Sequence, residues 1–262
     1  MSEEKRQVRS LLHAALVLLC LFFFGLGVFP GFGGSAFLLF ALMPIGFYFR
    51  LADVFLLGLM CGLVLFLGRT GMLGGLMFPP LPFAISLAAG LAAGKSLGFT
   101  KGAFDWMKTG VLGGRQVLIV GAIALLSAIS LVCWYRIVHP DVSDLAKLMP
   151  HADPAALIAA GSLFSISNAV CEEFFWRGAV YASLERALLP GAAVIAIQAA
   201  SFGMAHLHGF PRGASGIALA TIYGCILGWV RKNAGGLLAP VLAHVFADLT
   251  IFSILVFIAF GK

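Results

Sequence analysis

The stretch that decides the fold runs from residue 168 to residue 178 and reads Asn168-Ala169-Val170-Cys171-Glu172-Glu173-Phe174-Phe175-Trp176-Arg177-Gly178. It places two carboxylates and a guanidinium inside an otherwise apolar segment. Pro154 and Pro190 flank this segment and no proline lies between them, so the sequence predicts one long helix at about 155–187. Ionisable side chains are costly in hydrocarbon, and a cluster of them in an apolar helix therefore predicts a functional site.

Helical geometry assigns different tasks to the two adjacent glutamates. A helix turns about 100° per residue, so Glu172 and Glu173 point to different faces. Glu173 and Arg177 are four residues apart with the acid first, which is the favourable order for an ion pair on one helix. Asn168 and Glu172 have the same spacing on a neighbouring face. We therefore predict a structural ion pair between Glu173 and Arg177, which leaves Glu172 free for chemistry.

The composition predicts a membrane protein. Of 262 residues, 61% are hydrophobic and 11% are charged, and the mean hydropathy is +1.04. Soluble domains carry about 25% charged residues, so we expect an all-α, polytopic transmembrane helical bundle with about 8–9 spans. The net charge of +6 comes from basic residues scattered in short loops, which indicates orientation in a membrane and not nucleic-acid binding. The five cysteines lie in apolar segments without metal-ligand spacing, so we interpret them as packing residues.

Apolar runs separated by short polar loops predict the spans, which we expect at about 11–29, 34–49, 53–68, 71–93, 116–135, 155–187, 190–208, 214–230 and 237–260. Pro79, Pro80 and Pro82 predict a kink or break in the fourth span. In the basic loop from Lys95 to Arg115, the run Phe104-Asp105-Trp106 predicts a short amphipathic stretch that lies on the membrane surface.

The distribution of basic residues predicts the orientation. With nine spans and an inner N-terminus, the inner side holds twelve of the 17 basic residues, namely Lys5, Arg6, Arg9, Arg50, Lys95, Lys101, Lys108, Arg115, Arg177, Arg186, Arg231 and Lys232. The outer side holds the other five, Arg69, Arg136, Lys147, Arg212 and Lys262. Cytoplasmic loops carry an excess of Lys and Arg, so we expect a cytoplasmic N-terminus. The expected location is the plasma (inner) membrane of a prokaryote.

Two further polar clusters lie in the C-terminal half. Phe202 and His206 end the seventh expected span, and His244 and Asp248 lie four residues apart in the ninth. A lone histidine in an apolar helix is usually a packed ring bonded to a neighbouring carbonyl. Four ionisable residues on three apolar helices, Glu172, His206, His244 and Asp248, instead favour a common site.

These clusters resemble the motifs of the CPBP family of intramembrane proteases, which includes the CAAX prenyl-protein endopeptidases and the bacteriocin-processing or immunity-associated (Abi) proteins. The family pattern is EExxxR, then FxxxH, then HxxxN or HxxxD on successive membrane helices. In this chain it reads Glu172-Glu173 with Arg177, Phe202 with His206, and His244 with Asp248. The resemblance covers roughly Ala155 to Asp248.

The resemblance implies a role for each residue of the site. Glu172 is expected to be the general base that activates a water, and His206 to help hold that water. His244 and the residue at position 248 are expected to stabilise the oxyanion. An asparagine at 248 could donate a hydrogen bond, whereas an ionised aspartate cannot. Asp248 is therefore either protonated or orients His244 as an acceptor, and we favour the second because it needs no unusual protonation state.

The resemblance implies a glutamate-dependent intramembrane endopeptidase with no cofactor and no metal. Its partners are expected to be the lipid bilayer and a membrane-associated protein or peptide substrate, with no nucleic acid. Candidate substrates are prenylated C-terminal tails, bacteriocin leaders and C-terminal membrane-sorting signals. Residues 151–262 are expected to form the catalytic core, and residues 1–150 an N-terminal transmembrane region of unassigned role.

Other functions use the same residues. Glu172, His206 and His244 could be the ligands of a catalytic zinc, although no HExxH-type pair presents two ligands from one helix. Buried Glu, His and Asp could form the relay of a proton-coupled transporter, against which the sequence shows no internal repeat. A non-catalytic immunity or binding protein could also retain the fold.

Overall fold

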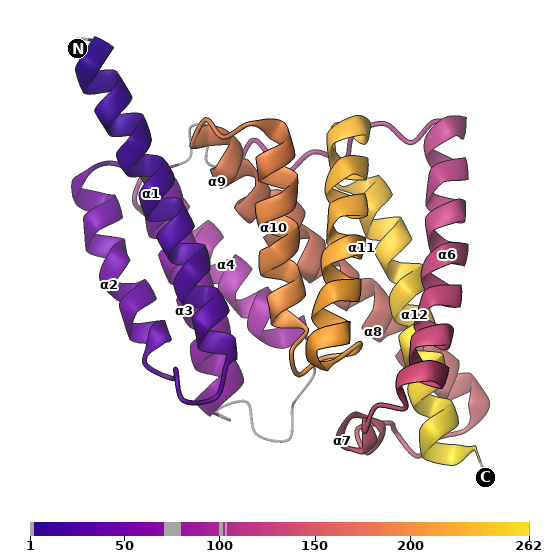
Figure 1. Cartoon of the computed structure of the whole chain (residues 1–262). Helices are drawn as coiled ribbons and strands as arrows, with labels where there is room; N and C mark the ends of the chain where they lie inside the picture. Colours follow the sequence, from indigo (N-terminus) through magenta and orange to yellow (C-terminus); the bar gives the residue numbers. More distant parts are fainter. Residues whose placement is uncertain (1–2, 71–79, 100–101, 103, 262) are drawn as a thin grey trace.

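Helices joined by short connections build the chain (Figure 1). The structure is a computed structural model, and it describes residues 3–70, 80–99, 102 and 104–261. In chain order its helical segments are α1 Glu3–Val28, α2 Ser35–Tyr48, α3 Ala52–Thr70, α4 Pro80–Ser96, α6 Gly114–Val138, α7 Ser143–Ala146, α8 Pro154–Glu173, the π-helical segment η1 Phe174–Val180, α9 Tyr181–Arg186, α10 Gly191–Ala205, α11 Gly213–Ala234 and α12 Leu238–Phe260. The all-α prediction is confirmed for these residues.

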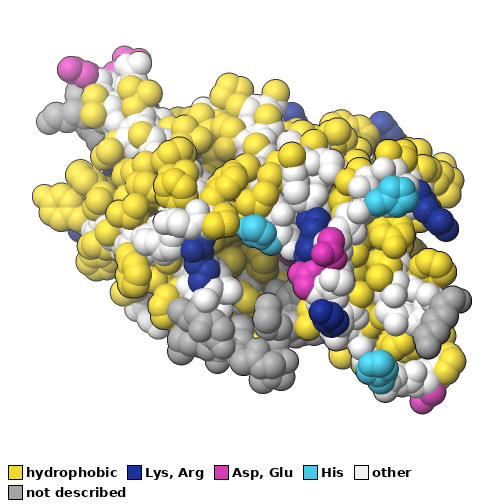
Figure 2. Space-filling view, turned by 60° about the horizontal axis from the view of Figure 1, so that its bottom comes forward, with side chains coloured by type: hydrophobic (Ala, Val, Ile, Leu, Met, Phe, Trp, Pro, Cys, Tyr) yellow, Lys and Arg dark blue, Asp and Glu magenta, His cyan; other side chains and the backbone are white. Residues whose placement is uncertain are grey.

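The helices are built to lie in hydrocarbon. Six of the described helical stretches are long and apolar enough to cross a membrane, namely Gln7–Val28, Ala52–Arg69, Gly114–Val138, Pro154–Arg186, Gly213–Ala234 and Leu238–Phe260. Large apolar side chains point outward from them, including Leu118 at 77% and Ile158 at 71% exposure. Figure 2 shows apolar side chains surrounding a smaller group of charged and histidine side chains at one end of the bundle. This surface suits lipid, and the protein is a multi-pass integral membrane protein.

The shorter helices differ from the expected spans in their bounds. α2 and α10 are apolar but only 14 and 15 residues long. The fourth expected span was 71–93, of which residues 71–79, including Pro79, lie outside the described residues. α4 begins at Pro80, where a missing backbone N–H costs no helical hydrogen bond, and continues to Ser96. Whether each shorter helix crosses the membrane stays a prediction.

The two ends of α11 lie beside different loops. At its start, Arg212 donates to the Asp144 carboxylate at 2.8 Å, which brings the α6–α8 connection to that end. At its finish, the Val111 backbone N–H donates to the Ala234 carbonyl at 2.8 Å, which brings the α4–α6 connection to the other end. A helix of 22 residues is about 33 Å long, enough to separate the two loops by a bilayer's hydrocarbon core.

Arg177 was counted among the inner basic residues, but its side chain is 0% exposed inside the bundle. The Glu173 carboxylate neutralises the Arg177 charge there, so this charge can be buried without contact with water.

The expectation that Phe104-Asp105-Trp106 lies on the membrane surface is wrong for Trp106. Its side chain is 5% exposed and belongs to the main hydrophobic core. A Cβ built on Gly178 would lie 2.4 Å from the Trp106 ring, so the indole fills the space that this glycine leaves. The rings of Trp106 and Phe174 also meet edge to face at 5.9 Å. The loop after α4 therefore packs against η1.

Aromatic side chains join the N-terminal helices to the motif helix, the stretch α8–η1 that carries Glu172, Glu173 and Arg177. Phe24 of α1 meets Trp176 edge to face at 5.4 Å, and Phe83 of α4 meets Phe175 at 5.2 Å. One hydrophobic core holds residues from α1, α2 and α3 together with residues from η1, α9 and α10. The N-terminal region thus supports the segment that carries the motif, and the division at residue 150 stays a prediction.

A buried carboxylate makes a second link between these regions. Asp53 at the start of α3 is 6% exposed. It accepts a hydrogen bond from Arg186 Nε at 2.9 Å, and His13 Nε2 of α1 lies 3.2 Å from its other oxygen. Arg186 also donates to the Gly102 carbonyl at 3.2 Å. This cluster ties α1 and α3 to the end of α9.

The orientation can be tested by labelling. In a background without native cysteines, a cysteine at Ser143 should react with an impermeant thiol reagent added outside intact cells, and a cysteine at Lys108 should not. The reason is that the two positions lie beside opposite ends of α11 and that the basic residues favour an inner position for Lys108. The reversed pattern would contradict the predicted orientation.

Candidate active site

The motif helix begins with a strong cap and changes geometry in its middle. The Asp153 side chain accepts from the Ala156 backbone N–H at 3.0 Å, and Pro154 occupies the first turn. The helix continues as α8 through Glu173 and then widens into η1. The predicted single helix is therefore continuous but not regular, and π-helical segments of this kind occur frequently at functional sites. Arg231 Nε donates to the Arg177 carbonyl within η1 at 3.2 Å.

Glu173 and Arg177 form a fully buried ion pair. Arg177 Nη1 donates to Glu173 Oε1 at 2.7 Å, and both side chains are 0% exposed. The Arg177 guanidinium carbon also lies 4.3 Å from the centre of the Phe202 ring, a cation–π contact. The contact matches the predicted pair, whose structural role stays a prediction.

The same Glu173 oxygen also holds His244. Glu173 Oε1 lies 2.7 Å from His244 Nδ1. A deprotonated carboxylate oxygen only accepts hydrogen bonds, so this geometry assigns the proton to Nδ1. His244 Nε2 then faces Glu172 Oε2 at 3.8 Å and Asp248 Oδ1 at 3.7 Å. These distances are too long for hydrogen bonds. The hydrogen bond that orients His244 therefore comes from Glu173, whereas the sequence had favoured Asp248 for this role.

Asn168 joins the site, although the sequence pattern marked it only as a helical neighbour of Glu172. Its amide Nδ2 donates to Asp248 Oδ2 at 3.1 Å in a buried contact. Asn168 therefore connects α8 to α12 and fixes the position of the Asp248 carboxylate. An amide four residues before Glu172 was the available signal in the sequence. Only the placement of α12 shows that this amide contacts Asp248.

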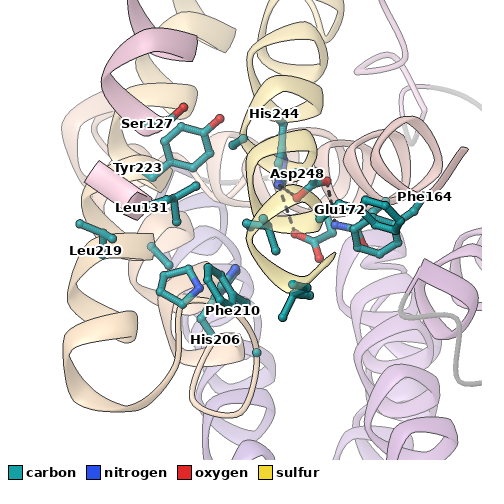
Figure 3. Close-up of a pocket in the computed structure, with 18 of the residues that line it drawn as sticks. Ser127, Leu131, Phe164, Glu172, His206, Phe210, Leu219, Tyr223, His244 and Asp248 are labelled. Carbon is teal, nitrogen blue, oxygen red and sulfur yellow. Dashed lines mark hydrogen bonds and ion pairs between the residues drawn. The ribbon is translucent and has the colours of Figure 1, made fainter. Parts of the chain in front are cut away.

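His206 lies in the same cavity but makes different contacts. Its Nδ1 lies 3.1 Å from the Phe202 carbonyl, which can only accept, so Nδ1 is the donor and Nε2 is left for another partner. Its ring meets Phe202 edge to face at 4.6 Å, and Phe202 also meets His244 at 6.0 Å. Figure 3 shows His206 across the cavity from Glu172. Phe202 thus separates the two histidines and packs against both.

A cavity of about 610 Å³ contains the predicted residues Glu172, His206, His244 and Asp248 in its lining. The rest of its lining is mainly apolar. Of the three carboxylates around His244, Glu172 is the most open, with 15% of its side chain exposed against 4% for Asp248 and 0% for Glu173. Glu172 is thus the carboxylate best placed to meet a molecule in the cavity.

The cavity extends toward the end of the bundle that carries α7. Leu148 and Met149 from the α6–α8 connection and Phe210 from the α10–α11 connection line it there. Arg212 ties these two connections together through paired contacts to Asp144 of 2.8 and 3.0 Å. The hydrogen bonds from Arg212 hold the pKa of the Asp144 carboxyl below its usual value. The count of basic residues placed this end outside.

The zinc alternative has little support in the side-chain arrangement. Among the residues that the structure describes, no three His, Cys, Asp or Glu side chains are grouped so that they could hold a metal ion. His206 stands apart from the pair that it would have to join, Glu172 and His244. A metal-free mechanism stays a prediction.

Comparison with known proteins identifies the class of this site. Residues 154–250 match the family model described as type II CAAX prenyl endopeptidase Rce1-like. This matched segment contains all three motifs, and the match confirms the resemblance to the CAAX protease family. Comparisons with curated proteins and with solved structures gave no match.

The buried pair predicts how the two glutamates differ. Glu173→Gln removes the charge that neutralises Arg177, and leaving a buried charge unpaired costs roughly 3–5 kcal/mol. We expect lower accumulation in the membrane and a lower melting temperature, both partly restored in the double variant Glu173→Gln/Arg177→Met. Detergent-solubilised thermal melts and quantitative immunoblots measure this. A Glu173→Gln protein that accumulates and melts like the wild type but has lost activity would contradict these roles. Glu173 would then be the general base, and Glu172 would have the structural role.

Proposed function

We propose that this protein is an intramembrane endopeptidase in which Glu172 activates a water for attack on a peptide bond of a membrane-associated substrate. A protease of the CAAX type is the class that the family match supports. The observation that carries the finer proposal is the contrast between the two adjacent carboxylates. Glu173 is committed to Arg177 and His244 at 2.7 Å each, whereas Glu172 lines the cavity and its contact with His244 is 3.8 Å long.

The proposed reaction is a hydrolysis in which atoms and charges balance. A water lies between Glu172 and the substrate carbonyl carbon, and Glu172 accepts a proton as the C–O bond forms. The carbonyl oxygen becomes an oxyanion. When the C–N bond breaks, Glu172 returns the proton to the leaving nitrogen. The products are a new carboxylic acid and a new amine, and the acid then loses its proton to the amine or to solvent.

The neighbouring side chains support this step. His206 can accept a hydrogen bond from the same water at Nε2, because its Nδ1 is used by the Phe202 carbonyl. His244 is held through Nδ1 by Glu173, and in its protonated form it can donate from Nε2 to the oxyanion. Asp248 accepts from Asn168, which keeps α8 and α12 in register around Glu172. No metal or cofactor enters this scheme.

The cavity favours one kind of substrate. An α-helix with side chains is about 10–12 Å wide, so a volume of about 610 Å³ takes little more than one helical turn. An extended peptide segment uses this volume better, and the apolar lining suits aliphatic side chains or a lipid attached to the substrate. We propose a membrane-anchored peptide terminus as the substrate and the plasma membrane of a prokaryote as the location.

Replacing the base tests the proposal. Glu172→Gln keeps the shape of the side chain, so we expect wild-type accumulation and melting with a loss of cleavage of about 10²–10⁴-fold, the usual contribution of a general base. The assay uses purified protein in detergent and a quenched fluorogenic peptide with a prenylated cysteine near its C-terminus. Glu185→Gln is the matched control, because Glu185 is exposed on α9 of the same helical stretch. Equal cleavage by wild type and Glu172→Gln would contradict the proposal.

A further inference from the structure

Most hydrogen-bond donors that line the cavity already have partners within the protein. Asn168 donates to Asp248 at 3.1 Å, and His244 Nδ1 donates to Glu173 at 2.7 Å. His206 Nδ1 donates to the Phe202 carbonyl of α10, the helix that ends immediately before it. On α6, the Ser127 hydroxyl donates to the Ala124 carbonyl at 3.0 Å. These protons are not free to stabilise a substrate.

Tyr223 of α11 differs from these groups. It lines the same cavity, and its ring meets the His244 ring edge to face at 5.8 Å. Its hydroxyl oxygen is buried and has no hydrogen-bond partner among the residues that the structure describes. A buried polar group without a partner destabilises the protein, and a phenylalanine would fill the same space without that cost. The hydroxyl is therefore best explained by a partner that is present when the cavity is filled.

The chemistry at position 248 shows which partner is needed. Asp248 accepts from Asn168 through Oδ2, and its Oδ1 lies 3.7 Å from His244 Nε2, so Asp248 acts as an acceptor in this arrangement. An acceptor cannot stabilise an oxyanion. His244 Nε2 supplies one donor in its protonated form, and the site needs a second, neutral donor close to it.

We propose that the Tyr223 hydroxyl donates a hydrogen bond to the substrate's carbonyl oxygen and stabilises the oxyanion as it forms. This inference rests on the endopeptidase function proposed above and adds a catalytic residue to it. Figure 3 shows Tyr223 and Glu172 on opposite sides of His244. A carbonyl between them would present its carbon to the water beside Glu172 and its oxygen to Tyr223.

Trp176 carries another buried donor without a partner among the described residues, at its indole nitrogen. Its ring is 0% exposed and is enclosed by Phe24, Phe175 and Phe202. Trp176 also lines the cavity, but the Tyr223 side chain is partly exposed, so a substrate in the cavity has better access to Tyr223.

Tyr223→Phe tests the proposal, because it removes only the hydroxyl. We expect kcat on the prenylated fluorogenic peptide to fall by about 10²-fold, as for the loss of one oxyanion donor, with little change in KM. The melting temperature should be unchanged or higher, because a buried unpartnered hydroxyl is lost. Tyr181→Phe is the matched control: the Tyr181 hydroxyl is also buried without a described partner, but Tyr181 does not line the cavity. Its kcat should equal that of the wild type.

The outcomes separate this proposal from the endopeptidase function. Tyr223→Phe with wild-type kcat, beside an inactive Glu172→Gln, would overturn the role of Tyr223 and leave the base in place. A rise in KM alone would also overturn it, because the hydroxyl would then contact the substrate before charge develops. Equal falls in Tyr223→Phe and Tyr181→Phe would show a general effect on the helices. A wild type that cleaves none of the peptide, or an active Glu172→Gln, would overturn the function on which the proposal rests.

Discussion

One oxygen atom of Glu173 organises the site. It accepts from Arg177 and from His244, each at 2.7 Å, in a part of the bundle where Glu173 and Arg177 are completely buried. A buried charge is tolerated only when its partners satisfy it, so these contacts must form together. They neutralise Arg177, orient His244 and occupy the carboxylate next to Glu172. The adjacent glutamates therefore have the same chemistry and different surroundings.

The rest of the structure keeps this arrangement in place. Trp106 packs over Gly178, and Arg231 donates to the Arg177 carbonyl at 3.2 Å, so a loop and a second helix both hold η1. Phe24 of α1 also packs on Trp176. The N-terminal region, which carries none of the motif residues, thereby contributes to the geometry of the site.

Local spacing was enough to predict some of the site. The i,i+4 rule placed Glu173 beside Arg177. The hydropathy pattern located α12, which carries His244, and α10, which ends immediately before His206. Contacts between helices could not be read in the same way, because they depend on how α8 and α12 cross. The bond from Glu173 to His244 and the bond from Asn168 to Asp248 are both of this kind. The burial of Trp106 was not predicted from the sequence. A short amphipathic run has the same residue pattern whether it lies on a membrane surface or packs over a glycine, here Gly178.

The most direct test of the central claim is a comparison of the C-terminal peptides of membrane proteins from cells that express the wild type or Glu172→Gln at equal levels. The account predicts a defined set of new C-termini, generated within or next to membrane anchors, that appear with the wild type and are missing with Glu172→Gln. Identical C-termini in the two samples, with both proteins folded in the membrane, would contradict the claim that this chain is a Glu172-dependent intramembrane protease.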